Sequence, residues 1–231
     1  MSLSKDNFLD GKTLLFNKPL GWSSFDVVKK VKYHICKKYN IKNLKVGHAG
    51  TLDPLASGLL IICTGKSTKI ISEIQKQKKT YTGTITLGGS TASFDLETEI
   101  DKKFSTSHIN NDLVYKIKNK FIGEIDQKPP VFSALKIAGE RLYKKARRGE
   151  KVMIKSRKVS VYKFDILSFK DLNIDFEIEC STGTYIRSIA NDFGNALNCG
   201  GHLSKLCRTA IGEYQLSKSI EILNFEDILN K

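Results

Sequence analysis

One stretch in the last third of the chain constrains the fold more than any other. Across residues 172–180, apolar side chains at every second position alternate with polar ones. A period of two places the apolar side chains on one face of a β-strand and the polar ones on the other. The chain therefore needs a sheet with one buried face, and residues 80–87 predict another of its strands by a similar alternation.

Helical spacing of apolar residues occurs before and between these strands. Residues 23–26 form a Ser-x-x-Asp capping signature, and the apolar residues that follow predict a helix as far as Tyr39. Strands interspersed with helices, often through hairpin-length connections, favour a mixed α+β sheet in a single domain. The other expected elements are strands at 13–16 and 59–63, loops at 47–58 and 88–107, helices at 111–121, 184–197 and 225–229, and a segment at 141–157 that starts helical and becomes extended.

The net charge indicates an anionic partner. The chain has 231 residues, and 38 basic against 24 acidic side chains leave a charge of +14. Nucleic acid and an acidic membrane surface are the leading candidates. A lysine-rich genome is the alternative explanation, because only six of the basic residues are arginine.

Several classes of protein are excluded. No run of about 18 uncharged apolar residues predicts a membrane span, and the N-terminus has no signal-peptide pattern. The five cysteines are scattered and form no Cys-x-x-Cys pair, so we expect neither a disulfide framework nor a zinc site. This use of cysteine is typical of a reducing, cytoplasmic location.

The basic residues are concentrated in two blocks. Asp53 is the only acidic residue between Asp26 and Glu73, a stretch that contains nine lysines. Residues 141–158 carry nine basic side chains against Glu150 alone. Either block by itself could be a solvated face, but two blocks that flank a lone carboxylate favour its ionised form.

The segment around Asp53 is built to present one side chain. Glycines precede and follow it within residues 47–58, and they permit a sharp turn and close approach of a ligand to the backbone. Pro54 disfavours the helical region for Asp53 and holds it extended. For an Asp-Pro pair alone, a structural turn is the plainer interpretation.

Five segments resemble, in the expected order, the motifs of the TruB family of tRNA pseudouridine synthases. Residues 46–65 resemble the family signature and contain Gly-His-Ala-Gly-Thr-Leu-Asp-Pro. Together the matches extend from residue 14 to about residue 215. The other four segments are residues 18–24, 79–81, 127–147 and 180–188.

The resemblance implies a fold and a reaction. The implied fold is one catalytic domain over residues 1–231, on a mixed, largely antiparallel sheet flanked by helices, with a thumb-like RNA-binding insertion at about 124–158. The implied reaction converts uridine to pseudouridine, usually uridine-55 in the TΨC loop of tRNA, with no metal or cofactor. The resemblance further implies a monomer with no obligate protein partner. The chain leaves no room for the PUA-type RNA-binding module that family members commonly carry, so we expect lower tRNA affinity or heavier reliance on the insertion.

The resemblance also assigns residues to roles. Asp53 matches the catalytic aspartate, either as a nucleophile or as the base of a glycal route. Arg187 is expected to be its ion-pair partner, and Tyr81 to stack on the flipped uracil. The expected substrate contacts are His48, where the flipped base departs, Tyr185 and Leu206 in the base pocket, Lys18, and the basic residues Arg141, Arg147 and Arg148. The face formed by residues 29–45 is a further candidate for RNA contact.

Alternatives stay open at this point. By residue type alone, Arg187 could be a surface residue at the start of a helix. Tyr81 could be a half-buried residue of a strand, and Leu206 could be a residue of the hydrophobic core. A non-catalytic tRNA-binding chaperone of the same fold is the alternative function. The presence of all four of the residues Asp53, Tyr81, Tyr185 and Arg187 favours an enzyme. An acidic-membrane binder needs exposed aromatics on an amphipathic helix, and residues 27–39 supply only the basic side.

Two segments depart from the family pattern. Residues 91–98 keep only part of a Thr-Asp-x-x-Asp-x-x-Gly motif, and Phe132 stands where a tyrosine is more usual.

Overall fold

The structure is a computed structural model that describes residues 4–133, 135–137, 139–150 and 152–230. The chain divides into two compact units: unit 1 contains residues 1–81 and 206–231, and unit 2 contains residues 82–205. The division falls inside strands β4 (Lys79–Leu87) and β12 (Gly201–Ile211), so each of these strands contributes residues to both units.

Unit 1 is built on strands in the order β14 (Ile220–Glu221), β1 (Thr13–Lys18), β3 (Ala56–Thr64) and β12. Strand β1 runs antiparallel to β3, with Phe16 opposite Leu60, whereas β12 runs parallel to β3, with Leu206 opposite Ala56. The sheet is therefore mixed, as predicted. Strand β2 (Val46–His48) pairs with β3, and strand β13 (Tyr214–Gln215) pairs with β12.

Helix α2 (Ser24–Tyr39) begins as the capping signature predicts. The Ser23 hydroxyl accepts a hydrogen bond from the Asp26 amide at 3.2 Å, and the Asp26 carboxylate accepts one from the Ser23 amide at 3.0 Å. Asn40 ends the helix in the left-handed conformation. The expectation that residues 27–39 carry no exposed aromatic side chain is wrong, because Tyr33 is 59% exposed. Phe25, two residues before that stretch, is also 59% exposed.

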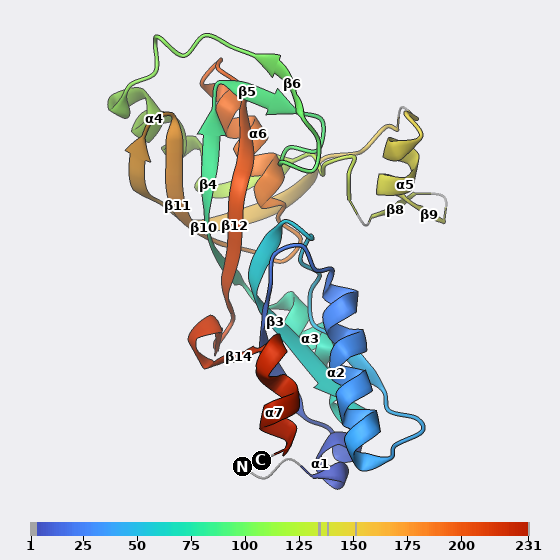
Figure 1. Cartoon of the computed structure of the whole chain (residues 1–231). Helices are drawn as coiled ribbons and strands as arrows, with labels where there is room; N and C mark the ends of the chain where they lie inside the picture. Colours follow the sequence, from blue (N-terminus) through green and yellow to red (C-terminus); the bar gives the residue numbers. More distant parts are fainter. Residues whose placement is uncertain (1–3, 134, 138, 151, 231) are drawn as a thin grey trace. The chain divides into compact units, whose positions relative to one another are not determined.

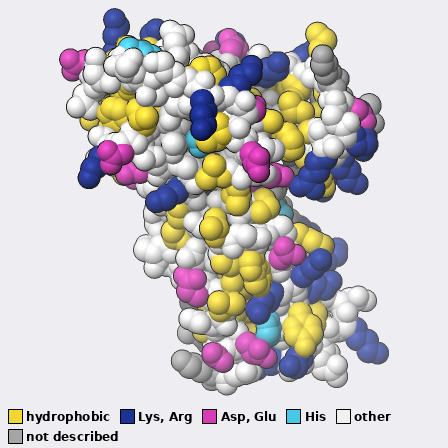
Figure 2. All heavy atoms as spheres, turned by 45° about the horizontal axis from the view of Figure 1, so that its top comes forward, with side chains coloured by type: hydrophobic (Ala, Val, Ile, Leu, Met, Phe, Trp, Pro, Cys, Tyr) yellow, Lys and Arg dark blue, Asp and Glu magenta, His cyan; other side chains and the backbone are white. Residues whose placement is uncertain are grey.

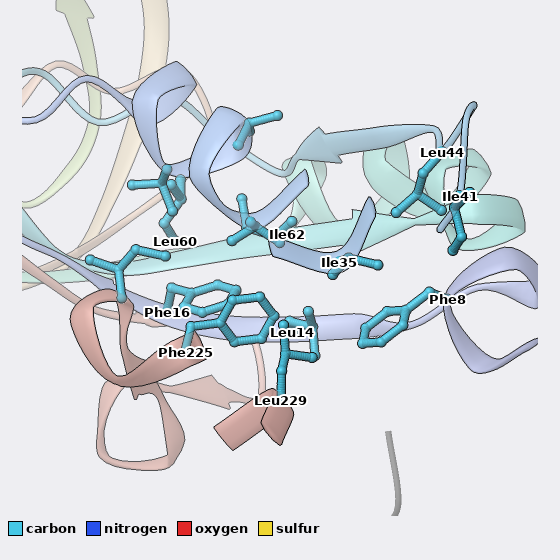
Figure 3. Close-up of a cluster of buried hydrophobic side chains, with 14 residues drawn as sticks. Phe8, Leu14, Phe16, Ile35, Ile41, Leu44, Leu60, Ile62, Phe225 and Leu229 are labelled. Carbon is cyan, nitrogen blue, oxygen red and sulfur yellow. The ribbon is translucent and has the colours of Figure 1, made fainter. Parts of the chain in front are cut away.

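The core of unit 1 lies between the sheet and two helices. Figure 1 shows α2 beside α7 (Phe225–Asn230), the short terminal helix that the sequence predicts. Figure 3 shows the side chains between them, where Phe16 meets Phe225 edge to face with ring centres 5.0 Å apart. The apolar positions of α2 that predicted the helix, among them Val31 and Ile35, belong to this cluster.

Unit 2 contains strands in the order β12-β4-β11-β10-β7. The long strand β10 (Arg157–Lys170) pairs antiparallel with β11 (Asn173–Cys180) and with β7 (Gly123–Gln127). Burial alternates along β11 as the sequence pattern predicts. Helix α6 (Ile186–Ala196) packs its Phe193 ring against Phe164 of β10, with ring centres 5.7 Å apart.

Two loops expected from the sequence, one in each unit, need correction. Residues 88–107 are not a loop throughout, because β5 (Gly89–Thr91) and β6 (Ile100–Lys103) form a hairpin. All four residues of β6 are exposed, so no buried face imposes an alternation that the sequence could show. The expected loop at 47–58 is shorter than predicted, since β2 and β3 extend into it from both ends.

The remaining elements are short. Helix α5 (Leu142–Arg147) and the two-residue strands β8 (Lys136–Ile137) and β9 (Glu140–Arg141) form the segment expected to be a thumb-like insertion. The predicted extended part begins only at β10. The other helices are α1 (Lys5–Asp10), α3 (Ile71–Lys76) and α4 (Asn111–Lys118), and 3-10 turns occur at 65–70, 119–121, 216–218 and 222–224. Within the described ranges, no helix is long and apolar enough to cross a membrane.

Candidate active site

Asp53 lies in the short connection between β2 and β3 of unit 1. The Ala49 amide donates to the Ile61 carbonyl at 2.9 Å, which closes one end of the connection onto β3. The Ala56 amide donates to the carbonyl of Asp53 itself at 3.0 Å, which closes the other. Gly50 has a φ of +112°, a value that glycine adopts without strain. The side chain of Asp53 is half-buried.

The first turn of α2 and the residues before it hold this connection on both sides of Asp53. The buried Ser24 hydroxyl accepts from the Leu52 amide at 2.8 Å and donates to the Leu52 carbonyl at 3.1 Å. The Gly21 amide donates to the Pro54 carbonyl at 2.8 Å. The residues immediately before and after Asp53 are therefore tied to one helix start, which limits the positions that the carboxylate can take.

A buried arginine that the sequence reasoning missed also holds the connection. Arg208 of β12 is 1% exposed, and its guanidinium donates to three backbone oxygens. These are the carbonyls of Leu59 at 2.9 Å, Gly50 at 3.0 Å and Thr51 at 3.4 Å. A Cβ at Gly58 would overlap the backbone oxygen of Arg208, so glycine is required for β3 and β12 to lie this close.

Lys18 approaches the same connection from β1 and is fully buried. Its ammonium donates to the carbonyls of Trp22 at 2.6 Å, Pro19 at 2.9 Å and Pro54 at 3.5 Å. Burial lowers the pKa of Lys18 to about 8; the Asp53 carboxylate opposes this lowering, and the Arg208 guanidinium adds to it. A substrate contact at Lys18 stays a prediction, and the partners that the structure shows are backbone oxygens.

Two buried cations thus accompany the carboxylate of Asp53. Lys18 and Arg208 both donate to carbonyls of the connection that carries it, from different strands of unit 1. A positive neighbour favours the ionised form of a carboxylate.

Three other predicted residues lie in unit 1. His48 ends β2 and is half-buried. Burial lowers its pKa; a hydrogen bond with the Gly50 backbone opposes this lowering, and the Arg208 charge adds to it. An imidazole of lowered pKa is neutral at pH 7, which suits stacking better than phosphate pairing. Leu206 pairs with Ala56, three residues after Asp53, and is partly exposed. Tyr81, in β4, is 9% exposed and so is buried rather than half-buried.

Arg187 lies in the first turn of α6 in unit 2. The alternative interpretation of a surface arginine is wrong, because Arg187 is 3% exposed. Its Nε lies 3.5 Å from Oδ2 of Asp95, and its Nη1 donates to the Ser93 carbonyl at 3.2 Å. The two buried side chains thus form an ion pair within unit 2.

Asp95 is a second residue that the sequence reasoning missed. Its carboxylate accepts from the Glu97 amide at 3.0 Å, and its carbonyl accepts from the Thr91 hydroxyl at 2.7 Å and the Ser93 hydroxyl at 3.1 Å. The segment that departs from the family pattern is therefore closed by hydrogen bonds. The retained aspartate of that pattern was the available signal.

Tyr185 directly precedes α6, and its backbone is paired with one side chain. Its amide donates to Oε1 of Gln127 at 2.7 Å, and its carbonyl accepts from Nε2 of the same residue at 3.0 Å. The Arg157 guanidinium lies 4.9 Å from the centre of the Tyr185 ring. The ring is therefore held by a cation as well as by its backbone.

Arg147 and Arg148 of the insertion are ion-paired. Arg148 binds both carboxylate oxygens of Glu140, at 2.7 and 2.8 Å, and Glu150 at 2.7 Å. Arg147 binds Glu97 at 2.9 Å, whereas Arg141 is exposed. The Arg148 guanidinium lowers the pKa of Glu140 below its usual range. Figure 2 shows dark-blue side chains gathered on this insertion, and an anion that binds Arg147 or Arg148 must compete with their carboxylate partners.

The predicted residues are thus distributed over both units. Lys18, His48, Asp53, Tyr81 and Leu206 lie in unit 1, and Arg141, Arg147, Arg148, Tyr185 and Arg187 lie in unit 2. Among the residues that the structure describes, no group of three or more His, Cys, Asp or Glu side chains is placed to hold a metal ion.

Comparison with protein families gives a match over most of the chain. A model described as the N-terminal domain of the TruB family of pseudouridylate synthases matches residues 37–186. A protein of Flavobacterium johnsoniae named tRNA pseudouridine synthase B is 54% identical over 228 residues, covering 98% of this chain and all of its own length. A protein of the same name from Phocaeicola vulgatus is 48% identical and covers 97% and 96% of the two chains.

Solved structures resemble the chain as well. The chain superposes on a structure titled as a crystal structure of a Cbf5-Nop10-Gar1 complex with a TM-score of 0.71 at 26% identity. The match covers 97% of this chain but 56% of the solved one, so the chain spans about half of that protein's length.

Proposed function

The chain belongs to the TruB family of pseudouridine synthases, and we propose that it converts uridine-55 in the TΨC loop of tRNA to pseudouridine. Relatives that match it over nearly their whole length are named tRNA pseudouridine synthase B, which supports tRNA as the substrate. We further propose that the chain acts as a single catalytic domain, as a monomer and in the cytoplasm.

One observation carries the proposal: the connection that bears Asp53 is fixed at its backbone by Ser24, Lys18 and Arg208. Isomerisation breaks the bond between N1 of uracil and C1′ of ribose, turns the base, and forms a bond from C5 to C1′, while C5 loses a proton and N1 gains one. A carboxylate held beside the sugar can attack C1′ or remove a proton to open a glycal route. Both routes need an ionised, aimed carboxylate, and buried cations beside Asp53 favour that state.

The other site residues take roles around this step. In the proposal, Arg187 keeps Asp53 ionised, Tyr81 stacks on the flipped uracil, and Tyr185 and Leu206 line its pocket. Arg187 is held by Asp95, so its guanidinium has a defined orientation before RNA arrives. A group that is oriented in advance does not have to be ordered during the reaction.

Access to the target requires base flipping. A uridine within a folded loop must be extruded, which costs a few kcal/mol of unstacking. In the proposal, the neutral ring of His48 replaces part of the lost stacking. The insertion, with Arg141, Arg147 and Arg148, holds the RNA arm through phosphate and shape contacts, as proteins commonly hold folded RNA.

A position-specific assay tests the proposal. The protein is incubated with an unmodified tRNA transcript, and pseudouridine is mapped along the product. We expect modification at position 55 and none in a transcript whose uridine-55 is replaced by cytidine. Pseudouridine at other positions only would overturn the assignment of the target. Tight binding with no pseudouridine in either transcript would favour the non-catalytic chaperone.

A further inference from the structure

Aromatic and basic side chains alternate along the exposed side of α2. Phe25, Lys29, Tyr33 and Lys37 follow one another at intervals of four residues, so successive members are neighbours on the helix surface. The Lys29 ammonium lies 4.7 Å from the centre of the Phe25 ring, and the Lys37 ammonium lies 5.8 Å from the centre of the Tyr33 ring. Both rings are 59% exposed. We call these four residues the α2 stripe.

An open hollow of about 650 Å³ lies beside the α2 stripe. The Lys30 ammonium lies 5.8 Å from the centre of the Trp22 ring, and both residues of this third aromatic–lysine pair line the hollow. Aromatic faces and ammonium groups in one hollow match the two parts of a nucleotide, its base and its phosphate. The lining residues are Gly21, Trp22, Asp26, Lys29, Lys30, Tyr33 and His34.

The charge of α2 favours a polyanion. The helix carries five lysines and one acidic residue, Asp26. The carboxylate of Asp26 is engaged by the Ser23 amide and hydroxyl in the capping box, and those bonds lower its pKa. Of the stripe's lysines, Lys37 has a carboxylate within ion-pair distance, that of Glu226 at 3.8 Å.

The geometry favours unpaired RNA over a membrane surface. The apolar face of α2, with Val27, Val31 and Ile35, is buried in the core of unit 1. A helix that lies in a membrane needs a continuous exposed apolar face, whereas here a lysine separates the two exposed rings. Aromatic rings bind nucleic acid mainly by stacking on unpaired bases.

We propose that the α2 stripe and the adjacent Trp22 bind a segment of unpaired RNA. Bases stack on the rings of Phe25, Tyr33 and Trp22, and phosphates attract Lys29 and Lys37. Because cation–π contacts at exposed sites are weak, the lysines leave the rings readily when phosphates arrive. The residues of this surface differ from those assigned to the proposed uridine site, and the proposal does not rest on the proposed isomerisation.

The test uses a short fluorescein-labelled oligoadenylate, which contains no uridine and so measures binding without turnover. Fluorescence anisotropy gives its affinity for the full chain. We expect Phe25→Ala with Tyr33→Ala to weaken binding at least about ten-fold, as the loss of base stacking predicts. We expect Lys29→Gln with Lys37→Gln to flatten the log–log salt slope by about 1.4, the value for two phosphates of a single strand.

Two controls make the result specific. Tyr115→Ala with Tyr162→Ala removes two exposed tyrosines of unit 2 and should leave the affinity within about two-fold of wild type, because base stacking acts only at the rings that contact RNA. Phe25→Leu with Tyr33→Leu keeps apolar bulk and should weaken binding like the alanine pair, which guards against a folding defect. Thermal unfolding of each variant is measured alongside.

Three results would overturn the proposal. The first is wild-type affinity in both variants of Phe25 and Tyr33, and the second is an equal loss of affinity for an RNA duplex of the same length. The third is no binding of oligoadenylate, with binding to phosphatidylserine vesicles that depends on the two rings. Failure here would leave the uridine-55 assay unaffected, because the probe carries no target base.

Discussion

The burial of Lys18 predicts how the stability of the protein depends on pH. Burial lowers the pKa of Lys18 to about 8, against an ordinary value of 10.5. Between these values the folded protein releases a proton that the unfolded chain keeps. The unfolded state then binds more protons, so the free energy of unfolding rises with pH across that window. Below about pH 8 both states are protonated, and the full cost of burying the charge is present.

The magnitude follows from the two pKa values. A difference of about 2.5 corresponds to about 3 kcal/mol, since each pKa unit is worth about 1.4 kcal/mol. We therefore expect the stability of wild type to rise by up to about 3 kcal/mol relative to Lys18→Met between about pH 8 and about pH 10.5. The comparison with Lys18→Met removes most contributions from other groups that titrate in the same window.

Urea unfolding at a series of pH values measures this difference. The chain has one tryptophan, Trp22, whose carbonyl accepts a hydrogen bond from Lys18, so its fluorescence reports on the same region. Lys66→Met is the matched control, because Lys66 is an exposed lysine whose pKa is raised by Asp10. The stability of wild type relative to Lys66→Met should show no such rise between about pH 8 and about pH 10.5. Parallel stability curves for wild type and Lys18→Met over the whole window would refute the reasoning.

Three further predictions concern the groups that position the site and the RNA. Arg208→Met leaves three carbonyls near Asp53 without their donor. The loss should lower the free energy of unfolding by about 3 kcal/mol, as measured by urea unfolding, and should also lower turnover of tRNA. Arg187→Ala should lower turnover of tRNA far more than binding, because the proposed role is toward Asp53 rather than toward phosphate; single-turnover kinetics and filter binding separate the two. Arg147→Ala with Arg148→Ala should flatten the salt dependence of tRNA affinity by up to about 2 in the log–log slope, measured by anisotropy.

Each of these predictions has a contradicting outcome. Wild-type stability in Arg208→Met would mean that the carbonyls find other partners. A loss confined to binding in Arg187→Ala would indicate a phosphate contact. An unchanged salt slope in the double variant would mean that Arg147 and Arg148 stay with their carboxylates when RNA binds.

Local patterns account for the parts of the fold that the sequence predicts. The cap at Ser23 and the alternation along β11 depend on neighbours in the sequence, so both could be recognised. Strand β12 could not, because it passes through both units and its burial does not alternate along its length. The exposed rings of Phe25 and Tyr33 could have been recognised, because they lie off the positions of the apolar residues of α2.

The candidate site, too, contains features that the sequence predicts and features that it does not. Asp53 stands in a motif, and its glycine-rich surroundings are visible in the sequence. The burial of Lys18 and Arg208 is not, because their partners are backbone carbonyls from distant segments, and no residue pattern marks a carbonyl as an acceptor. The scarcity of arginine was a usable signal, since an arginine that persists among so many lysines suits a fixed geometry with several acceptors.

The central claim is that the carboxylate of Asp53 performs the isomerisation. The most direct measurement is release of tritium from a tRNA transcript labelled at C5 of uridine, since the C5 proton is lost when C5 joins the ribose. Wild type should release tritium, and Asp53→Asn should bind the same transcript with similar affinity and release none. Equal release by wild type and Asp53→Asn would contradict the account.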